Sequence, residues 1–300
     1  MQRDLDEAST LSRKPTGKNA SSPDGSGTQP TLVIEPTRGF LHLDLRALWE
    51  YRELLYFLVW RDVRVRYKQT ALGVAWAVLQ PFLTMMIFLV IFGMFAKFPS
   101  DGLPYPIFAY NAILIWYCFS QAATNAAQSL VGESALLKKV FFPRLIVPLA
   151  AVIRPVVDFA VSFVLLLAMM AWYRIAPTWA MLTVPLFVLL AITTAFAIGL
   201  WLSALNVRYR DVGQTFPFLI QVWMFASPVA YSISLVPERW QLLYSLNPLV
   251  GVIEGLRWAV LGTPTPPLTA IILSTAIVLI VLAGGLVYFK RMERTFADIA

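Results

Sequence analysis

The residues best suited to chemistry in this chain are four cations, Arg61, Arg64, Arg66 and Lys68, which lie within eight consecutive residues. Guanidinium and ammonium groups bind phosphates and other anions through charge-assisted hydrogen bonds and a positive field. An apolar segment begins at Ala71, and this boundary marks a membrane surface on the cytoplasmic side, which positive charge prefers. The cluster therefore predicts a cytoplasmic mouth that meets anions. Topology signalling with lipid-headgroup contact is a compatible alternative.

A second set of charged residues lies inside apolar segments. Arg154 and Asp158 stand four apart, and Glu254 and Arg257 stand three apart, so each pair shares a helix face and can neutralise itself in a membrane. For Arg154 and Asp158 we favour a structural ion pair over a lining pair or proton relay, because a relay needs an unpaired charge. For Glu254 and Arg257 a structural pair and a role in a gate are equally supported.

Motifs for enzymatic chemistry are absent from the sequence. It contains no G-x-x-x-x-G-K-[ST] phosphate loop, no H-E-x-x-H and no cluster of metal ligands. The one cysteine, Cys118, and the one histidine, His42, offer neither a disulfide within the chain nor a nucleophile–histidine set. We therefore predict that the chain is not an enzyme, holds no metal or cofactor of its own, and draws energy from an ion gradient or another subunit.

The elements that must position these residues follow from composition. Of 300 residues, 58% are hydrophobic and 14% charged, against about 25% charged in soluble domains, which predicts an all-α polytopic membrane protein. Residues 1–38 are polar and predict a disordered cytoplasmic tail, followed by one transmembrane domain over 39–300. Residues 45–68 predict an amphipathic interface helix. Since a span needs about 20 apolar residues, six are expected, at 71–96, 107–131, 145–172, 181–205, 215–231 and 268–289.

The distribution of cations predicts the orientation. Twelve membrane-proximal cations fall on the side of the chain termini and four on the other side, so both termini are expected in the cytoplasm. Residues 236–261 are apolar but broken at Asn247 and Pro248. They predict two half-length helices in a re-entrant hairpin at the outer face, between spans five and six, where broken backbone lines or closes a pathway.

Polar and aromatic residues complete the candidate site. Asn111, Gln121, Asn125 and Gln128 in the second span should face protein or water. Most aromatic residues fit a membrane-interface belt, but several fall elsewhere and could stack on the sugars of a sliding polymer. These channel candidates are Tyr110, Trp116, Tyr117, Trp201, Trp223, Phe225 and Tyr231.

Taken together, these stretches resemble the permease subunit of ABC transporters that export polysaccharides such as O-antigen, teichoic acid and capsule. The resemblance covers about residues 40–290, and the long polar N-terminal tail departs from it. It is carried by RDVRVRYKQTALGVAWAVLQP at 61–81, LLKKVFFPR at 136–144, NVRYRDV at 206–212, FASPVAY at 225–231 and NPLV at 247–250.

The resemblance implies a homodimer of six-span permeases in a bacterial inner membrane, with two separate ATPase subunits that hold ATP and magnesium. It implies a glycan on undecaprenyl diphosphate as substrate, and an outer gate that includes Asn247, Pro248, Glu254 and Arg257. It also implies a coupling segment over 133–142 that docks into the ATPase through Glu133, Leu136, Leu137, Lys138, Lys139 and Phe141.

Two other functions are alternatives to this one. A proton-coupled secondary transporter would use Arg154, Asp158 and Glu254 as proton sites, but the sequence shows no internal repeat, which weighs against it. A membrane-embedded glycan-modifying enzyme would need a His, Asp or Ser constellation that the sequence lacks.

Overall fold

The computed structural model of the chain describes residues 45–68, 73–263 and 266–293, and every regular element within these ranges is a helix. The described residues all belong to one compact unit. The tail expected over 1–38 lies outside the described residues. The all-α prediction is therefore confirmed for the part of the chain that the structure describes.

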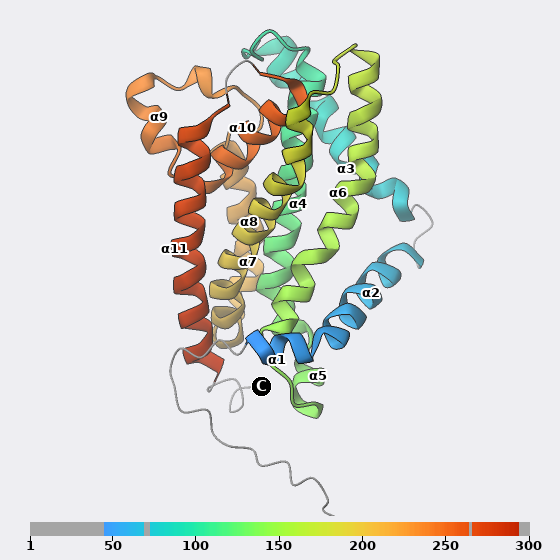
Figure 1. The fold of residues 1–300 in the computed structure, drawn as a ribbon, viewed down its shortest axis with the longest axis vertical. Helices are drawn as coiled ribbons and strands as arrows, with labels where there is room; N and C mark the ends of the chain where they lie inside the picture. The colour runs from blue at the N-terminus through green and yellow to red at the C-terminus, as the bar shows by residue number, and fades with distance from the viewer. Residues whose placement is uncertain (1–44, 69–72, 264–265, 294–300) are drawn as a thin grey trace, which may run out of the picture. The chain divides into compact units, whose positions relative to one another are not determined.

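The helices follow one another with short connections (Figure 1). Two helices lead into the bundle, and α3 continues into a π-helical segment, Leu89–Phe95, whereas a 3₁₀ turn, Trp179–Thr183, precedes α7. The bounds are α1 Leu45–Glu50, α2 Arg52–Lys68, α3 Gly73–Phe88, α4 Tyr105–Gly132, α5 Ser134–Lys139, α6 Ile146–Trp172, α7 Val184–Arg208, α8 Asp211–Phe225, α9 Glu238–Tyr244, α10 Pro248–Leu261 and α11 Leu268–Glu293.

Helix α4 is the centre of the bundle. It packs against α3, α6, α7, α8 and α10, while α11 lies against α7 and α10, and α2 lies against α6 (Figure 1). Most of α4 is buried, from Tyr105 to Leu130. Because its neighbours shield it, α4 can carry polar side chains that a lipid-facing helix could not. Asn111 is fully buried, and Gln128 donates to the Gly213 carbonyl at 3.1 Å, so these residues face protein as expected.

Four segments are long and apolar enough to cross a membrane: Gly73–Phe95, Ile146–Trp172, Trp179–Arg208 and Leu268–Glu293. They correspond to the first, third, fourth and sixth spans expected from the sequence. Helix α4 has 28 residues and α8 has 15. That α4 and α8 cross the membrane stays a prediction. Helix α4 is long enough but carries polar residues on its buried faces, and α8 is short.

Two expected helix boundaries are wrong. The helix expected over 215–231 instead runs from Asp211 to Phe225, and residues 226–231 form turns and bends. Pro228 explains the end, since proline has no N–H to continue a helix and disfavours helical geometry at the residue before it. The interface helix expected over 45–68 is interrupted at Tyr51, between α1 and α2.

Close packing of α10 on α7 depends on Gly255. A β-carbon at this position would overlap the ring of Phe187, so we expect Gly255→Ala to lower the free energy of unfolding by about 1–3 kcal/mol through overpacking. Gly132→Ala is the matched control, because nothing lies within 4 Å of its added carbon, and its effect should stay within about 0.5 kcal/mol. Thermal unfolding in detergent measures both, and equal effects would contradict the packing argument.

Candidate functional site

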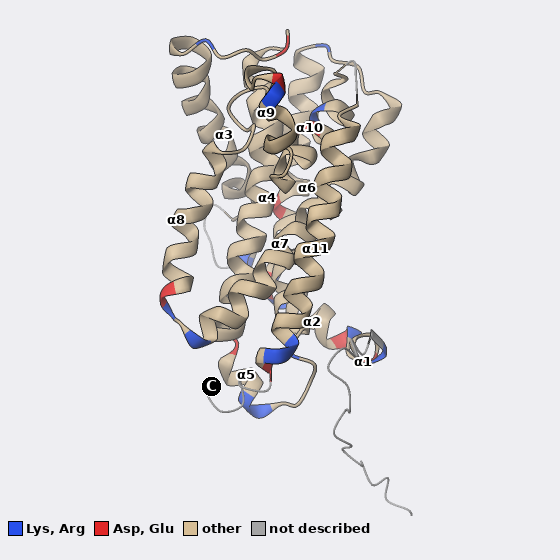
Figure 2. Ribbon diagram, turned by 90° about the vertical axis from the view of Figure 1, so that its left-hand side faces the viewer, with Lys and Arg blue, Asp and Glu red and all other residues tan. Residues whose placement is uncertain are grey.

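Charged residues gather at the two ends of the bundle. Figure 2 shows most of them at the end that carries α1, α2 and α5, with a smaller group at the opposite end near α9. We call the first the charged end and the second the hinge end. The separation fits a slab of hydrocarbon between them, and the cations predicted to meet anions belong to the charged end.

Arg61 is bound to carboxylates rather than free for a ligand. It lies 2.9 Å from an oxygen of Asp62 and forms an ion pair with Glu133, the residue between α4 and α5. The hydrogen bond to Glu133 raises the pKa of Arg61 above its ordinary value, despite partial burial. Arg61 therefore joins α2 to the start of the expected coupling segment.

Arg66 is likewise engaged, with Asp158 of α6. Its Nη2 lies 2.9 Å from Asp158 Oδ2, and the Tyr67 hydroxyl donates to the other carboxylate oxygen. Partial burial, followed by the hydrogen bond to Asp158, raises the pKa of Tyr67, so this hydroxyl stays protonated and remains a donor. Two neighbouring residues of α2 thus share one buried carboxylate.

The expected ion pair between Arg154 and Asp158 is wrong. Among the described residues, the cation within ion-pair distance of Asp158 is Arg66, whereas Arg154 donates from Nη2 to the Asn125 side-chain oxygen at 3.1 Å. The spacing along α6 permits the expected pair, but Arg66 of α2 binds the Asp158 carboxylate instead. Arg154 binds Asn125 of α4.

Arg64 and Lys68 are the exposed members of the cation cluster. The Arg64 guanidinium lies over the Trp60 ring, 4.6 Å from its centroid. Within the described residues, no carboxylate lies in ion-pair distance of Arg64 or Lys68. The structure therefore divides the predicted anion site into two structural and two solvent-facing cations.

A cavity of about 210 Å³ opens between α2, α4 and α6. Charged and amide side chains line it together with small residues of α4 and α6. The polar lining includes Arg61, Asp62, Asn125, Gln128, Glu133 and Arg154. The cations and carboxylates of this lining balance, so the cavity offers room and hydrogen bonds rather than a net positive charge.

The expected coupling segment presents a short helix and an exposed ring. Helix α5 has six residues, and Lys138 and Lys139 are exposed. Phe141 is 86% exposed, whereas its neighbour Phe142 is 5% exposed and packs with a hydrophobic cluster that Leu136 and Leu137 also touch. Of the residues predicted to dock, Phe141 and the two lysines point outward, and the two leucines pack inward.

At the hinge end, Asn247 connects three segments. Its side-chain oxygen accepts from the Leu249 backbone N–H and from Trp223 Nε1 at 3.1 and 3.2 Å, so it caps α10 in the manner preferred for asparagine. Its nitrogen donates to the Ala226 carbonyl and to the Ser227 hydroxyl. The break expected at Asn247 and Pro248 is thus present, with α9 before it and α10 after it.

Arg257 lies at the centre of the hinge end and is completely buried. Its guanidinium is 2.6 Å from Glu254 and 2.6 Å from the Pro228 carbonyl, and it lies 3.8 Å from the centroid of the Phe108 ring. The expected pair between Glu254 and Arg257 is therefore confirmed. Arg257 also donates a hydrogen bond to the Pro228 carbonyl, in the turn that follows α8. This bond joins α10 to the end of α8, and the contact with the Phe108 ring joins α10 to α4.

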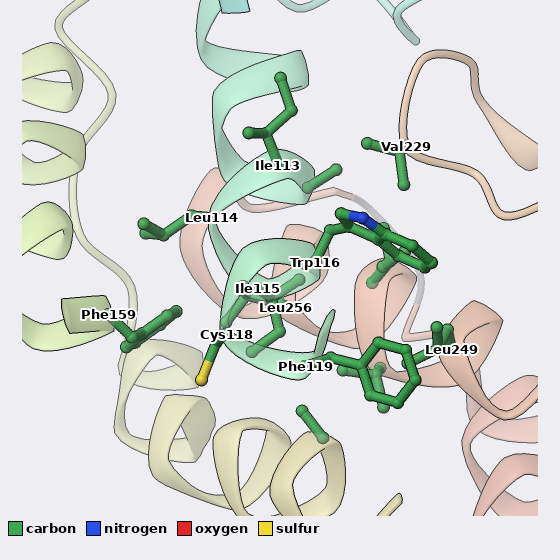
Figure 3. Close-up of a cluster of buried hydrophobic side chains, with 14 of the residues drawn as sticks. Ile113, Leu114, Ile115, Trp116, Cys118, Phe119, Phe159, Val229, Leu249 and Leu256 are labelled. Atoms are coloured by element: carbon green, nitrogen blue, oxygen red, sulfur yellow. The ribbon is translucent and has the colours of Figure 1, made fainter. Parts of the chain in front are cut away.

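The channel aromatics divide by exposure. Tyr110 and Trp116 are buried in the core, and Figure 3 shows Trp116 among Val229, Phe119 and Leu249. In this structure these two rings have no free surface for a glycan. Phe225 and Trp201 are exposed, although the Trp201 ring stacks on Tyr288. The others are partly buried and make hydrogen bonds: Tyr117 with Thr84, Trp223 with Asn247, and Tyr231 with Tyr244.

Several contacts of the site join residues far apart in the chain and were not found from the sequence. They include Arg61 with Glu133 and Arg66 with Asp158, and Ser232 with Asp101 at 2.5 Å. No local spacing signals them, because helical periodicity relates only residues within a few turns. A search for charged residues in and beside the apolar segments would have found the residues of the two ion pairs, but not which cation binds which carboxylate.

A protein-family model described as "ABC-2 type transporter" matches residues 53–261 of this chain. The match runs from α2 through α10, so it includes the hinge end and, at the charged end, α2 and α5. The chain belongs to the ABC-2 type transporter family. With its apolar helices, it is a multi-pass membrane permease of that family.

Three transport proteins are similar to this chain along most of its length. An O-antigen export system permease protein RfbA from Myxococcus xanthus is 28% identical over 85% of this chain and 98% of its own length. One from Klebsiella pneumoniae is 28% identical over 82% and 95%. The polysialic acid transport protein KpsM of Escherichia coli is 23% identical over 67% and 78%.

Proposed function

We propose that this chain is the transmembrane subunit of an ATP-driven exporter that moves a lipid-linked polysaccharide out of the cytoplasm across the bacterial inner membrane. The observation that carries the proposal is the similarity to O-antigen export permeases over 98% of the length of one relative. The substrate is a glycan on a diphosphate-linked polyprenyl lipid, of the undecaprenyl type. ATP and magnesium are bound and used by a separate ATPase subunit.

The architecture of the proposed exporter uses six spans with both termini in the cytoplasm. Helices α4 and α8 are the second and fifth spans, beside the four long apolar segments. Helices α9 and α10 form the outer gate as a re-entrant hairpin that turns at Asn247. The ion pair of Glu254 with Arg257 and the cap by Asn247 support α10 as a rigid half of that hairpin.

Two copies of the chain form the transport path. Large apolar side chains are exposed along α3, including Leu83 and Ile87, and along α8, including Phe218 and Val222. These faces of the first and fifth spans meet between protomers and separate to let the glycan pass. Phe225 and Trp223 at the end of α8 are the rings placed to stack on sugars there.

Docking of the ATPase occurs at the charged end. Helix α5 and Phe141 present an exposed edge, and Arg61 links this segment to α2 through Glu133. ATP binding closes the ATPase pair, α5 follows, and α2 receives the displacement through that ion pair. The proton-coupled alternative has less support, because Asp158 and Glu254 are held by arginines.

Reconstitution tests this proposal. The purified chain, alone or with its ATPase, is placed in vesicles that contain polyprenyl-diphosphate glycan, and transfer of glycan to the opposite leaflet is measured. We expect transfer only with the ATPase and MgATP. Transfer by the chain alone under a pH gradient would establish the proton-coupled alternative instead.

The solvent-facing cations offer a specific test of substrate contact. We expect Arg64→Glu with Lys68→Glu to reduce glycan transfer by at least about tenfold, because each cation near a membrane surface contributes about 1 kcal/mol of attraction to anionic groups. The matched control is Arg174→Glu with Arg239→Glu, two exposed cations elsewhere with the same charge change. Membrane orientation is checked by protease accessibility, and unchanged transfer at preserved orientation would remove the substrate role.

A further inference from the structure

Helix α2 buries few of its side chains on the bundle. Leu58 is its single buried residue among those described, and Leu54, Leu55 and Val59 are only partly buried against the same hydrophobic cluster. The polar contacts of α2 with the bundle come from Arg61, Arg66 and Tyr67. Elements with little buried apolar area open at lower free energy than core helices. Helix α2 can therefore shift relative to α6 with a smaller loss of apolar contact than a core helix such as α4 would suffer.

Such a shift creates a difficulty for Asp158. This carboxylate is buried in α6, and both groups that bind it, Arg66 and Tyr67, belong to α2. A buried charge that loses its partner is strongly destabilising. Motion of α2 would thus be opposed unless another cation replaces Arg66.

Arg154 is positioned to be that cation. It precedes Asp158 by four residues on α6, the spacing at which helix side chains meet. Its Nη2 donates to the Asn125 side-chain oxygen, and its Nε has no hydrogen-bond partner among the described residues. Arg154 lines the cavity between α2, α4 and α6, so its side chain has space to turn, and it already interacts electrostatically with Asp158 and Arg66.

We propose that Arg66 and Arg154 are alternating partners of Asp158, with Arg66 bound while α2 is packed on α6 and Arg154 bound when α2 moves away during transport. The exchange keeps the buried carboxylate neutralised in both states. Arg154 acts in this way as a positioning residue for α2. The motion of α2 rests on the proposed function, whereas the alternative pairing can be tested on the chain alone.

A double-mutant cycle tests the pairing. Arg66→Gln, Arg154→Gln and the double variant are each made with Asp158 and with Asp158→Asn, and the half-life of the folded chain in detergent is measured at one elevated temperature. Each single change should cost less than about threefold, because the remaining arginine binds Asp158. The double variant should shorten the half-life at least about tenfold beyond the product of the single effects, or about 1.4 kcal/mol.

The neutral background decides the cause of that loss. Asp158→Asn should restore most of the half-life of the double variant, since no carboxylate is then left unpaired. The matched control combines Arg154→Gln with Arg64→Gln. Arg64 is an exposed arginine of α2, the helix that carries Arg66, and the effects of these two changes on the half-life should be additive. The pairing is overturned if Arg66→Gln alone equals the double variant, if the double variant is additive, or if Asp158→Asn restores nothing.

The motion is tested in the complex with the ATPase. Spin labels at Val65 on α2 and Leu279 on α11, both exposed, are introduced with Cys118→Ala, and their distance distribution is compared with and without bound ATP. We expect a second distance in the ATP state that Arg154→Gln depletes. One unchanged distance in a complex that transports glycan would overturn the exchange. A complex that does not form would count against the proposed function alone and leave the pairing result standing.

Discussion

Replacement of Arg257 by methionine is expected to lower the free energy of unfolding by about 3–5 kcal/mol. Methionine removes the charge but keeps a long side chain, so the loss is electrostatic rather than one of volume. Glu254 would then be a buried carboxylate without its cation, and the carbonyl of Pro228 would lose its donor.

The position of Arg257 explains why replacing one residue should lower the free energy of unfolding so strongly. Its guanidinium touches α10 through Glu254, the end of α8 through Pro228, and α4 through the Phe108 ring. These segments have no continuous backbone ladder between them. Without the arginine, the Pro228 carbonyl after α8 would need a hydrogen bond from water or from a rearranged neighbouring segment.

Thermal unfolding of the purified chain and its abundance in the membrane measure the effect. Arg239→Met is the matched control, because this arginine of α9 is exposed, and it should change the free energy of unfolding by less than about 0.5 kcal/mol. Glu254→Gln combined with Arg257→Met should recover part of the loss, since no unpaired carboxylate remains. Equal effects of the two arginine variants would contradict a structural ion pair at the hinge.

Local sequence features predicted the parts of the site that depend on neighbours along one helix. Glu254 and Arg257 are three residues apart and form the expected pair. The break at Asn247 and Pro248 also follows from residue types, since asparagine caps helices and proline suits their first turn. The all-helical class and the polar character of α4 follow from composition and periodicity in the same way.

Partners from other helices decided the rest. Arg154 has Asp158 at the correct spacing, yet Arg66 holds that carboxylate, 92 residues earlier in the chain. The four-cation cluster looked uniform in the sequence. In the structure, Arg61 pairs with Glu133 at the end of α4 and Arg66 pairs with Asp158 of α6, whereas Arg64 and Lys68 are exposed. Such differences arise from which faces of the helices meet, and a single sequence does not encode that geometry locally.

Burial also separated residues that looked alike. Trp116 and Phe225 are both rings of apolar segments, but the first lies in the core (Figure 3) and the second is exposed. Phe141 and Phe142 are adjacent phenylalanines that differ in the same respect. The second pair gives the sharpest functional test of the charged end.

Phe141→Ala is expected to weaken association with the ATPase at least about thirtyfold and to reduce glycan transfer with it, while the chain stays folded. Phe141 is 86% exposed and contributes little to the stability of the isolated chain. A buried aromatic anchor is a common hot spot of protein interfaces, where truncation costs 2 kcal/mol or more, about a thirtyfold loss of affinity. Co-purification with the ATPase and transfer in vesicles measure the two effects.

Phe142→Ala is the matched control at the next position. Phe142 packs with Leu58 of α2 and with residues of α4, α6, α7 and α11 in one hydrophobic cluster, so its truncation should cost about 3–5 kcal/mol of stability. The two variants therefore separate docking from folding with the same chemical change. If Phe141→Ala bound the ATPase normally, the exposed ring would not be the anchor, and the docking surface would have to lie elsewhere on the charged end. If Phe141→Ala instead lowered stability as much as Phe142→Ala, its exposure in the isolated chain would be wrong.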